Sequence, residues 1–254
     1  MARSYRAADR SLEEGVAVSG SRRKERVASH GNSSRRRPPP FDMNIERWNE
    51  LLASLGAEAD PETFEKLQAA YGQKDRAYHT ARHINECLAL LDELKQLAEQ
   101  PAEVELALWF HDAIYEPMSK SNEERSAEWA DDFAKNAGVS SDARARIRSH
   151  IEATRHLARP ADGDSRLVVD IDLAILGAAP PRYGEFERDV RREYRWVPGF
   201  IYRSKRAAIL QSFLDRPRIY NWESVFRQFE DRARSNLSAA IFALRGDAIT
   251  QDVE

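Results

Sequence analysis

The sequence contains a single cysteine, Cys87, among its 254 residues. One cysteine excludes an intramolecular disulfide framework and any zinc site built from several thiolates, and it is typical of a reducing compartment. The apolar stretches are interrupted by charge well before the roughly 18 residues that a membrane span needs. We therefore expect a cytoplasmic protein that does not cross a membrane.

Glycine-rich functional loops are also missing, because the 11 glycines are scattered along the chain. There is no P-loop and no dinucleotide-binding fingerprint, and the Gly-x-Ser-x-Gly elbow of serine hydrolases is absent. Cys87 lies in an apolar helical stripe, which favours a buried structural thiol over a nucleophile. Any chemistry is therefore expected from histidine and carboxylate side chains.

Excess charge of one sign is lacking in the chain as a whole, which has 39 basic and 42 acidic residues. A uniformly basic nucleic-acid-binding surface is therefore not expected. Residues 1–42 differ, because they are rich in arginine and poor in apolar side chains, which predicts a disordered basic extension. This arm is the one feature that favours nucleic acid; a targeting peptide and a solvated extension are the alternatives. We expect one globular domain over residues 43–246 and a short flexible tail over 247–254.

Strand signals are almost absent after residue 43, where apolar residues recur at helical spacing. Helices are expected over residues 45–55, 61–72, 79–100, 101–110, 122–137, 141–157, 180–196, 200–215 and 221–245. Asp60 before Pro61 has the form of a helix cap followed by a first-turn proline. Residues 167–173 are ambiguous between strand and helix, and their helical surroundings favour a helix. The predicted fold class is all-α.

The most unusual local feature is the pair His111-Asp112 inside the apolar run 107–115. Burying an unpaired carboxylate costs at least several kcal/mol, so Asp112 needs a cation, a metal ion or several hydrogen-bond donors. The alternative is structural: Asp112 would cap the next helix or pair with an arginine, and His111 would be an ordinary core residue.

Two further pairs of ionisable residues lie in stretches with helical periodicity. His79 and His83 are four residues apart and so share one face of a helix, although such a pair is more often incidental than a metal site. Asp170 and Asp172 lie in the apolar run 168–176. In a strand they would share a face, whereas in a helix they diverge by about 200°, so only one would reach a shared site.

The histidines and carboxylates of these three places form a mixed nitrogen and oxygen donor set without a thiolate. Such a set suits a divalent ion of manganese, iron, cobalt, nickel, magnesium or zinc and does not choose among them.

The order His83, His111-Asp112, Asp172 resembles the His…His-Asp…Asp signature of the HD-domain superfamily of metal-dependent phosphohydrolases. The resemblance is closer to a bacterial subgroup of predicted phosphohydrolases and covers about residues 43–245. Its flanking motifs are Tyr78-His79-Thr80, Trp109-Phe110-His111-Asp112-Ala113-Ile114-Tyr115, Asn122-Glu123, Thr154-Arg155-His156, Val190-Arg191-Arg192-Glu193-Tyr194 and Lys205-Arg206.

The resemblance implies a single HD-type helical bundle in which His83, His111, Asp112 and Asp172 bind the metal. Residues expected to support these ligands or to hold a second ion are His79, His156 and Asp170. If residues 141–157 form one helix, His150 and His156 diverge by about 240°, and we expect His156 to face the site and His150 to be exposed.

The implied reaction is attack of a metal-activated water on a phosphate ester, with Asp112, Glu116 and Glu123 as the catalytic candidates. Glu116 has an alternative as a loop carboxylate and Glu123 as a helix-start residue. Arg191 and Arg206 are candidates for phosphate binding, because guanidinium matches phosphate oxygens, or for ordinary salt bridges.

The expected partners are a small phosphorylated substrate, such as a nucleotide or related metabolite, and a second copy of the chain. The rival function is a metal- or nucleotide-binding regulatory module without turnover. The complete set of four ligands favours the enzyme.

Overall fold

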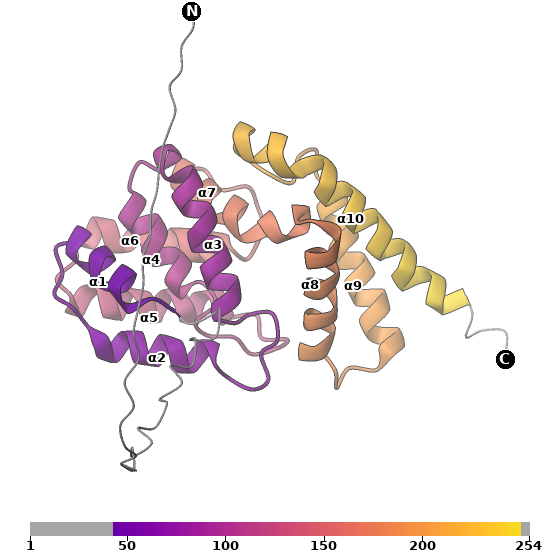
Figure 1. The fold of residues 1–254 in the computed structure, drawn as a ribbon, viewed down its shortest axis with the longest axis horizontal. Coiled ribbons are helices and arrows are strands. Elements are labelled where there is room, and N and C mark those ends of the chain that lie inside the picture. Colours follow the sequence, from indigo (N-terminus) through magenta and orange to yellow (C-terminus); the bar gives the residue numbers. More distant parts are fainter. Residues whose placement is uncertain (1–42, 250–254) are drawn as a thin grey trace, which may run out of the picture. The chain divides into compact units, whose positions relative to one another are not determined.

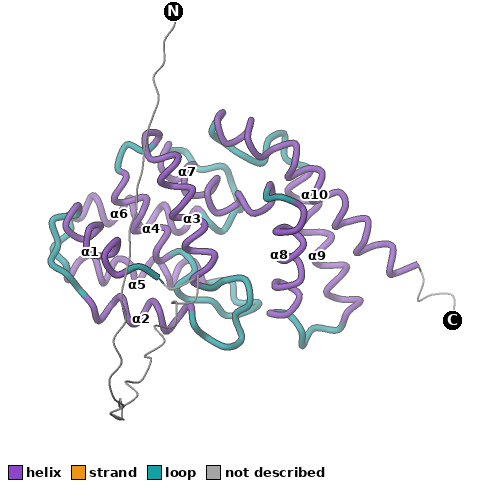
Figure 2. Tube along the Cα trace, viewed as in Figure 1, coloured by secondary structure: helices purple, strands orange, loops and turns teal. Residues whose placement is uncertain are grey.

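The computed structural model describes residues 43–249. The expected extension 1–42 and the end of the expected tail, residues 250–254, lie outside this part. Figure 2 shows helices and loops, and no strand occurs among the described residues. This confirms the all-α prediction for that part of the chain. None of its helices is both long enough and apolar enough to span a bilayer.

The elements follow one another with short connections and include two 3₁₀ helices, labelled η. They are α1 (Ile45–Ser54), α2 (Pro61–Tyr71), α3 (Ala81–Leu94), η1 (Lys95–Leu97), α4 (Pro101–Phe110), α5 (Asn122–Asn136), α6 (Ser141–Ala153), α7 (Gly163–Asp172), η2 (Leu173–Gly177), α8 (Pro180–Glu193), α9 (Gly199–Leu214) and α10 (Glu223–Ile249).

Helix α4 lies at the centre of the core, because all its residues from Glu103 to Phe110 are buried. It packs against α1, α3, α5, α6 and α7. A helix covered on all sides needs an apolar sequence rather than an amphipathic one, which explains the apolar run before His111. The aromatic residues of this core are Trp48, Phe64, Trp109, Phe110 and Phe133. This packing fixes the end of α4, where the His-Asp pair begins.

Helices α8, α9 and α10 form the second half of the fold, and α9 and α10 run side by side (Figure 1). Both α8 and α10 contact η2, the short helix that follows α7. The approach is close at Gly177, where an added Cβ would lie 2.7 Å from the Cβ of Phe229. Glycine is therefore required there, and the contact fixes the direction in which α7 ends.

Two predicted boundaries were imprecise in ways that matter for the site. Helix α3 begins at Ala81, so His79 lies in the preceding loop rather than in the helix. Helix α6 ends at Ala153, and His156 adopts the left-handed backbone region with a φ of 56°. The ambiguous run 167–173 is helical almost throughout, since α7 extends to Asp172. As predicted, Asp60 caps α2 and accepts a hydrogen bond from the Thr63 N–H.

Candidate metal centre

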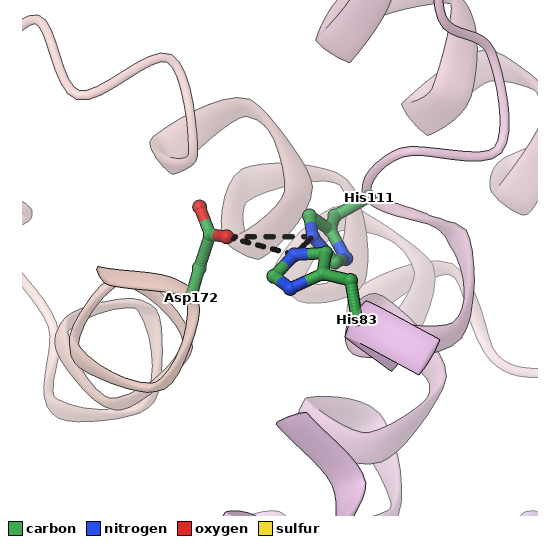
Figure 3. Close-up of side chains that lie close together, drawn as sticks. All are labelled: His83, His111 and Asp172. Atoms are coloured by element: carbon green, nitrogen blue, oxygen red, sulfur yellow. Dashed lines mark hydrogen bonds and ion pairs between the residues drawn. The ribbon is translucent and has the colours of Figure 1, made fainter. Parts of the chain in front are cut away.

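Four of the predicted residues come from three helix ends that meet in space. His83 lies in the first turn of α3, His111 directly follows α4 with Asp112 next to it, and Asp172 is the last residue of α7. Figure 3 shows the carboxylate of Asp172 directed at the imidazole rings of His83 and His111. The helical phase thus brings Asp172 to the histidines, as the sequence predicted for one of the two aspartates of α7.

The donor atoms of these residues lie close together. His83 Nε2 is 3.1 Å from His111 Nε2 and 3.1 Å from Asp172 Oδ1. Asp112 Oδ2 is 3.1 Å from His111 Nε2 and 3.5 Å from His83 Nε2. In the part of the chain that the structure describes, His83, His111 and Asp172 form a group able to hold a metal ion, with donor atoms within 4.8 Å of one another.

The outer nitrogen of each buried histidine is held by a hydrogen bond. His111 Nδ1 lies 2.9 Å from the carbonyl oxygen of Leu108. Because a carbonyl can only accept, Nδ1 must carry the proton, and in neutral His111 the lone pair on Nε2 faces the cluster. His83 Nδ1 lies 3.0 Å from the hydroxyl of Tyr78. This arrangement of the outer nitrogens is the one that orients histidines which bind metals.

The electrostatics of the cluster reflect two carboxylates that share a confined space with histidines. Burial by itself would lower the pKa of His111, but Asp112 and Asp172 outweigh burial and raise that pKa well above its usual value. Burial would conversely raise the pKa of Asp172, yet His111, His156 and His83 hold it well below its usual range. The cluster therefore needs positive charge, either from protonated imidazoles or from a cation.

His156 reaches the same site from the loop after α6. Its Nε2 lies 2.9 Å from Asp172 Oδ2, the carboxylate oxygen that faces away from His83. Its left-handed backbone is sustained by Arg216, whose Nη2 donates to the His156 carbonyl over 2.6 Å. The expectation that His156 faces the site is thus met, but by a strained loop residue rather than by a helix.

His79 is held beside the site by Glu193 of α8, a residue to which its motif in the sequence gave no role. Glu193 accepts from the backbone N–H groups of Ala77, Tyr78 and His79, and its Oε2 lies 2.7 Å from His79 Nδ1. Burial would raise the pKa of Glu193, but His79 and the backbone donors lower it to about 2. Glu193 thus holds in place the loop that presents Tyr78 to His83.

Arg76 is a second residue that the sequence did not reveal. It is buried and donates to the backbone carbonyls of Asp112 and Ala113 over 2.7 and 2.8 Å and to that of His79 over 3.2 Å. Arg76 therefore ties the His-Asp turn to the loop before α3. No local pattern could identify this role, because the carbonyls of Asp112 and Ala113 are distant from Arg76 in sequence.

Asp170 has structural partners instead of the expected supporting place beside the ligands. Both of its oxygens accept from the Asn221 N–H, Oδ1 also accepts from the Asn221 side chain, and Oδ2 also accepts from the Trp222 N–H. Burial is the largest influence on its pKa and raises it to about 6 against these hydrogen bonds. Asp170 thus fixes the loop that leads into α10.

The prediction that His150 is exposed was wrong, because its side chain is fully buried between α6 and the start of α7. Its Nδ1 lies 2.8 Å from the hydroxyl of Ser165. Burial lowers the pKa of His150 in spite of the nearby Asp162, Asp164 and Glu103. Sequence spacing placed it away from His156 correctly, but it could not show that α7 covers this face of α6.

The two glutamates proposed for catalysis have surface partners. Glu116 Oε1 lies 2.7 Å from Arg125 Nη1 in an exposed ion pair. Glu123 stands in the first turn of α5, and its Oε2 is 3.7 Å from Arg155 Nε. These contacts agree with the alternatives of a loop carboxylate for Glu116 and a helix-start residue for Glu123.

The two arginines proposed for phosphate are engaged within the fold. Arg206 Nη2 lies 2.7 Å from Glu187 Oε1, and its guanidinium packs over the ring of Phe186. Arg191 donates to the carbonyls of Tyr194 and Val197 at the end of α8. Both arginines therefore stabilise the α8–α9 region, and the salt-bridge alternative holds for Arg206.

A cavity of about 300 Å³ reaches the cluster between α3 and η2. His83, Asp172 and Cys87 line it together with Arg182 and Phe229. Arg182 binds both oxygens of Glu86 at 2.8 Å through Nε and Nη2, while its buried Nη1 has no hydrogen-bond partner in residues 43–249. The space is large enough for a phosphate group.

Comparison of the chain with protein-family models, curated proteins and solved structures found no significant match. The site is therefore interpreted from its own geometry.

Proposed function

We propose that this protein is a metal-dependent phosphohydrolase with the helical fold of the HD-domain superfamily. The observation that carries the proposal is the meeting of His83, His111, Asp112 and Asp172, which are distant in sequence, with donor atoms 3.1 to 3.6 Å apart. The order of these residues along the chain, which resembles the superfamily signature, supports the same interpretation.

The donor set fits a divalent ion in both spacing and charge. Donor atoms about 2.1 Å from one ion lie about 3 Å apart at neighbouring corners of its coordination shell. The distances between the imidazole nitrogens and the carboxylate oxygens are close to this value. Two carboxylates would also balance the charge of a divalent ion, so neither imidazole would need to be protonated.

When bound, such an ion lowers the pKa of a water molecule and neutralises charge on a phosphoryl oxygen. The chain's own residues hold the surrounding geometry. Tyr78 and the Leu108 carbonyl fix the two imidazoles, and Arg76 holds the turn that carries Asp112. His156 can exchange a proton at Nε2, the atom that it presents to Asp172.

We infer that the substrate is a small phosphorylated molecule, because the cavity at the cluster is of that scale. Arg182, which lines this cavity, replaces Arg191 and Arg206 as the arginine best placed for a phosphate. The single buried thiol fits a reducing compartment, and we propose that the activity is cytoplasmic.

The proposal is tested by purifying the full chain without chelator, measuring bound metal, and screening the metal-loaded protein against phosphomonoesters, phosphodiesters and nucleotides. Asp172→Asn should lose both metal and phosphate release. Asp131→Asn is the matched control, because Asp131 pairs with Arg144 on the surface of α5, and it should retain both.

The outcomes separate the two candidate functions. Metal bound through Asp172 without hydrolysis of any compound would favour a regulatory module that binds metal. A chain that contains no metal and takes up no added Mn²⁺, Co²⁺, Ni²⁺ or Zn²⁺ would contradict both.

A further inference from the structure

A second cavity, of about 400 Å³, lies between two loops that are far apart in the sequence. One is the loop 156–160 after α6, and the other is the loop 216–221 between α9 and α10. His156 belongs to the wall of this cavity, while its Nε2 contacts Asp172 of the candidate metal centre. The cavity and the cluster are thus separated by one imidazole ring.

The lining of this cavity is basic, although the globular part of the chain is acidic. Arg159, Arg216 and Arg218 line it, and no aspartate or glutamate is among the described residues that do. The cavity at α1 contains Glu50, Asp92 and Glu105, and the one at α3 contains Glu86, Glu93 and Asp172. Acidic side chains outnumber basic ones in both of these cavities, whereas the cavity beside His156 is basic. A further cavity between α9 and α10, lined by Arg203 and Arg245 without a carboxylate among its described residues, has the same sign.

Two of its arginines form no salt bridge within residues 43–249. Arg218 pairs with Glu223 at 2.9 Å, whereas the one side-chain hydrogen bond from Arg216 in the described part of the chain goes to the neutral His156 carbonyl. The Arg216 guanidinium also lies 4.4 Å from the ring centre of Phe213. Burial lowers the pKa of Arg216, and no carboxylate contributes to offset it. Arg159 is exposed and takes part in no salt bridge in the described part of the chain. The oxygens of Asp170, whose pKa Arg159 helps to lower, are occupied by Asn221 and Trp222.

We propose that this cavity is an anion-binding subsite for a phosphate group, held by Arg159 and Arg216. A guanidinium offers up to five N–H donors in a plane that matches phosphate oxygens. If the proposed hydrolase function holds, on which this part of the inference rests, the ligand is a phosphate of the substrate other than the one that is hydrolysed. The substrate then carries two phosphate groups rather than one.

Arg216 also links this cavity to the candidate metal centre. Arg216 holds the carbonyl of His156, whose backbone is left-handed. An anion bound to Arg216 would therefore affect the position of His156, the residue that contacts Asp172. The exposed side chain of Leu157, which also lines the cavity, offers an apolar surface for the organic part of a substrate.

The test is calorimetric titration of the metal-free full-length protein with inorganic phosphate at low ionic strength. Arg159→Gln and Arg216→Gln should each weaken phosphate binding by at least about tenfold, as expected for the loss of a charge-assisted hydrogen bond. Arg188→Gln, which removes the same charge from an exposed position on α8 away from these cavities, should bind phosphate like the wild type. Arg159→Gln is expected to leave the fold intact, because Arg159 forms no hydrogen bond in the described part of the chain. A loss of phosphate binding in this variant would therefore not be due to misfolding.

Unchanged phosphate binding in both variants, or an equal loss in Arg188→Gln, would overturn the proposed subsite. If the metal-loaded protein hydrolyses a compound while neither substitution weakens phosphate binding, the inference fails and the proposed function stands. If phosphate binding depends on both arginines but no compound of the panel is hydrolysed, the subsite stands and the proposed hydrolase function fails.

Discussion

Two regions of this protein bury histidine side chains to the same extent, but the groups that contact the imidazole rings differ. His83, His111 and His150 all have 2% or less of their surface exposed. At the first region Asp112 and Asp172 are in contact with the imidazole nitrogens, and the pKa of His111 is raised. At the second, the nearest partner of His150 is the neutral hydroxyl of Ser165 at 2.8 Å, the Asp162 carboxylate is farther away at 3.8 Å, and burial outweighs it and lowers the pKa of His150.

The difference shows that burial alone does not make a histidine a metal ligand. His150, whose nearest partner is Ser165, is stable as a neutral ring, so no cation is needed beside it. The cluster around His111 instead concentrates negative charge, which protonation or a metal ion must balance. The two regions therefore differ in the carboxylates that contact the imidazole rings, and not in the burial of the histidines.

The largest effect is expected from removing the charge of a carboxylate in the first region. Asp112→Asn keeps the shape of the side chain but removes its charge, so phosphate release by the metal-loaded protein should fall at least about a hundredfold in kcat. Circular dichroism should show unchanged helical content, because the core of α4 is apolar. An Asp112→Asn variant with wild-type kcat would remove this carboxylate from the mechanism.

The second effect compares the histidines directly by metal content. His111→Ala should lose most of the bound metal, because it removes a donor from the cluster. His150→Ala should keep the metal, since its Nδ1 is engaged with Ser165, even if the cavity it leaves lowers the melting temperature. Equal loss of metal in both variants would show that the two regions are not distinct.

The third effect concerns the support of the first region. Glu193→Gln removes a buried charge that binds His79 and three backbone N–H groups, and it should destabilise the fold by about 3 kcal/mol in denaturant unfolding. Because the folded pKa of Glu193 is about 2 against an ordinary 4.5, this contribution is present above pH 4.5 and is lost as the pH falls toward 2.

A matched control for Glu193 is Glu62→Gln, which removes one member of an exposed pair with Lys66. Such exposed pairs contribute little to stability, because solvent screens them. If the two substitutions cost the same, the hydrogen bonds of Glu193 do not hold the loop before α3.

The smallest effect is the pH dependence of the second region. Burial lowers the pKa of folded His150 below the unfolded value of 6.5, so the unfolded chain binds a proton more readily. The stability from neutral His150 is therefore complete above pH 6.5 and decreases as the pH falls below it. His150→Gln should flatten this part of the stability profile, measured by denaturant unfolding between pH 5 and 8. A profile identical to that of the wild type would contradict this assignment.

Local sequence chemistry predicted some features well. Asp60 and Pro61 mark the start of α2 because capping needs only neighbouring residues. The two-residue spacing of Asp170 and Asp172 in a helix predicted that a single aspartate would reach the histidines, and Asp172 does so. Both follow from short-range geometry.

Other expectations failed where the partner is distant in sequence. His150 was expected to be exposed, but α7 covers it. For Arg206 the sequence left phosphate binding and a salt bridge open, and only the fold shows that Glu187 of α8 is its partner. Neither contact can be predicted from the residues that neighbour His150 or Arg206 in their own helices.

The sequence by itself determined the helical class of the described part and the residue types available for chemistry, because helical periodicity and donor chemistry are local properties. Only the tertiary structure decided which of those residues meet. Glu193 and Arg76 hold the loop and the turn that present Tyr78 and Asp112, and their partners are backbone groups from other parts of the chain. The energy of such contacts depends on how α3, α4, α7 and α8 pack, and a pattern within one segment carries no record of that packing.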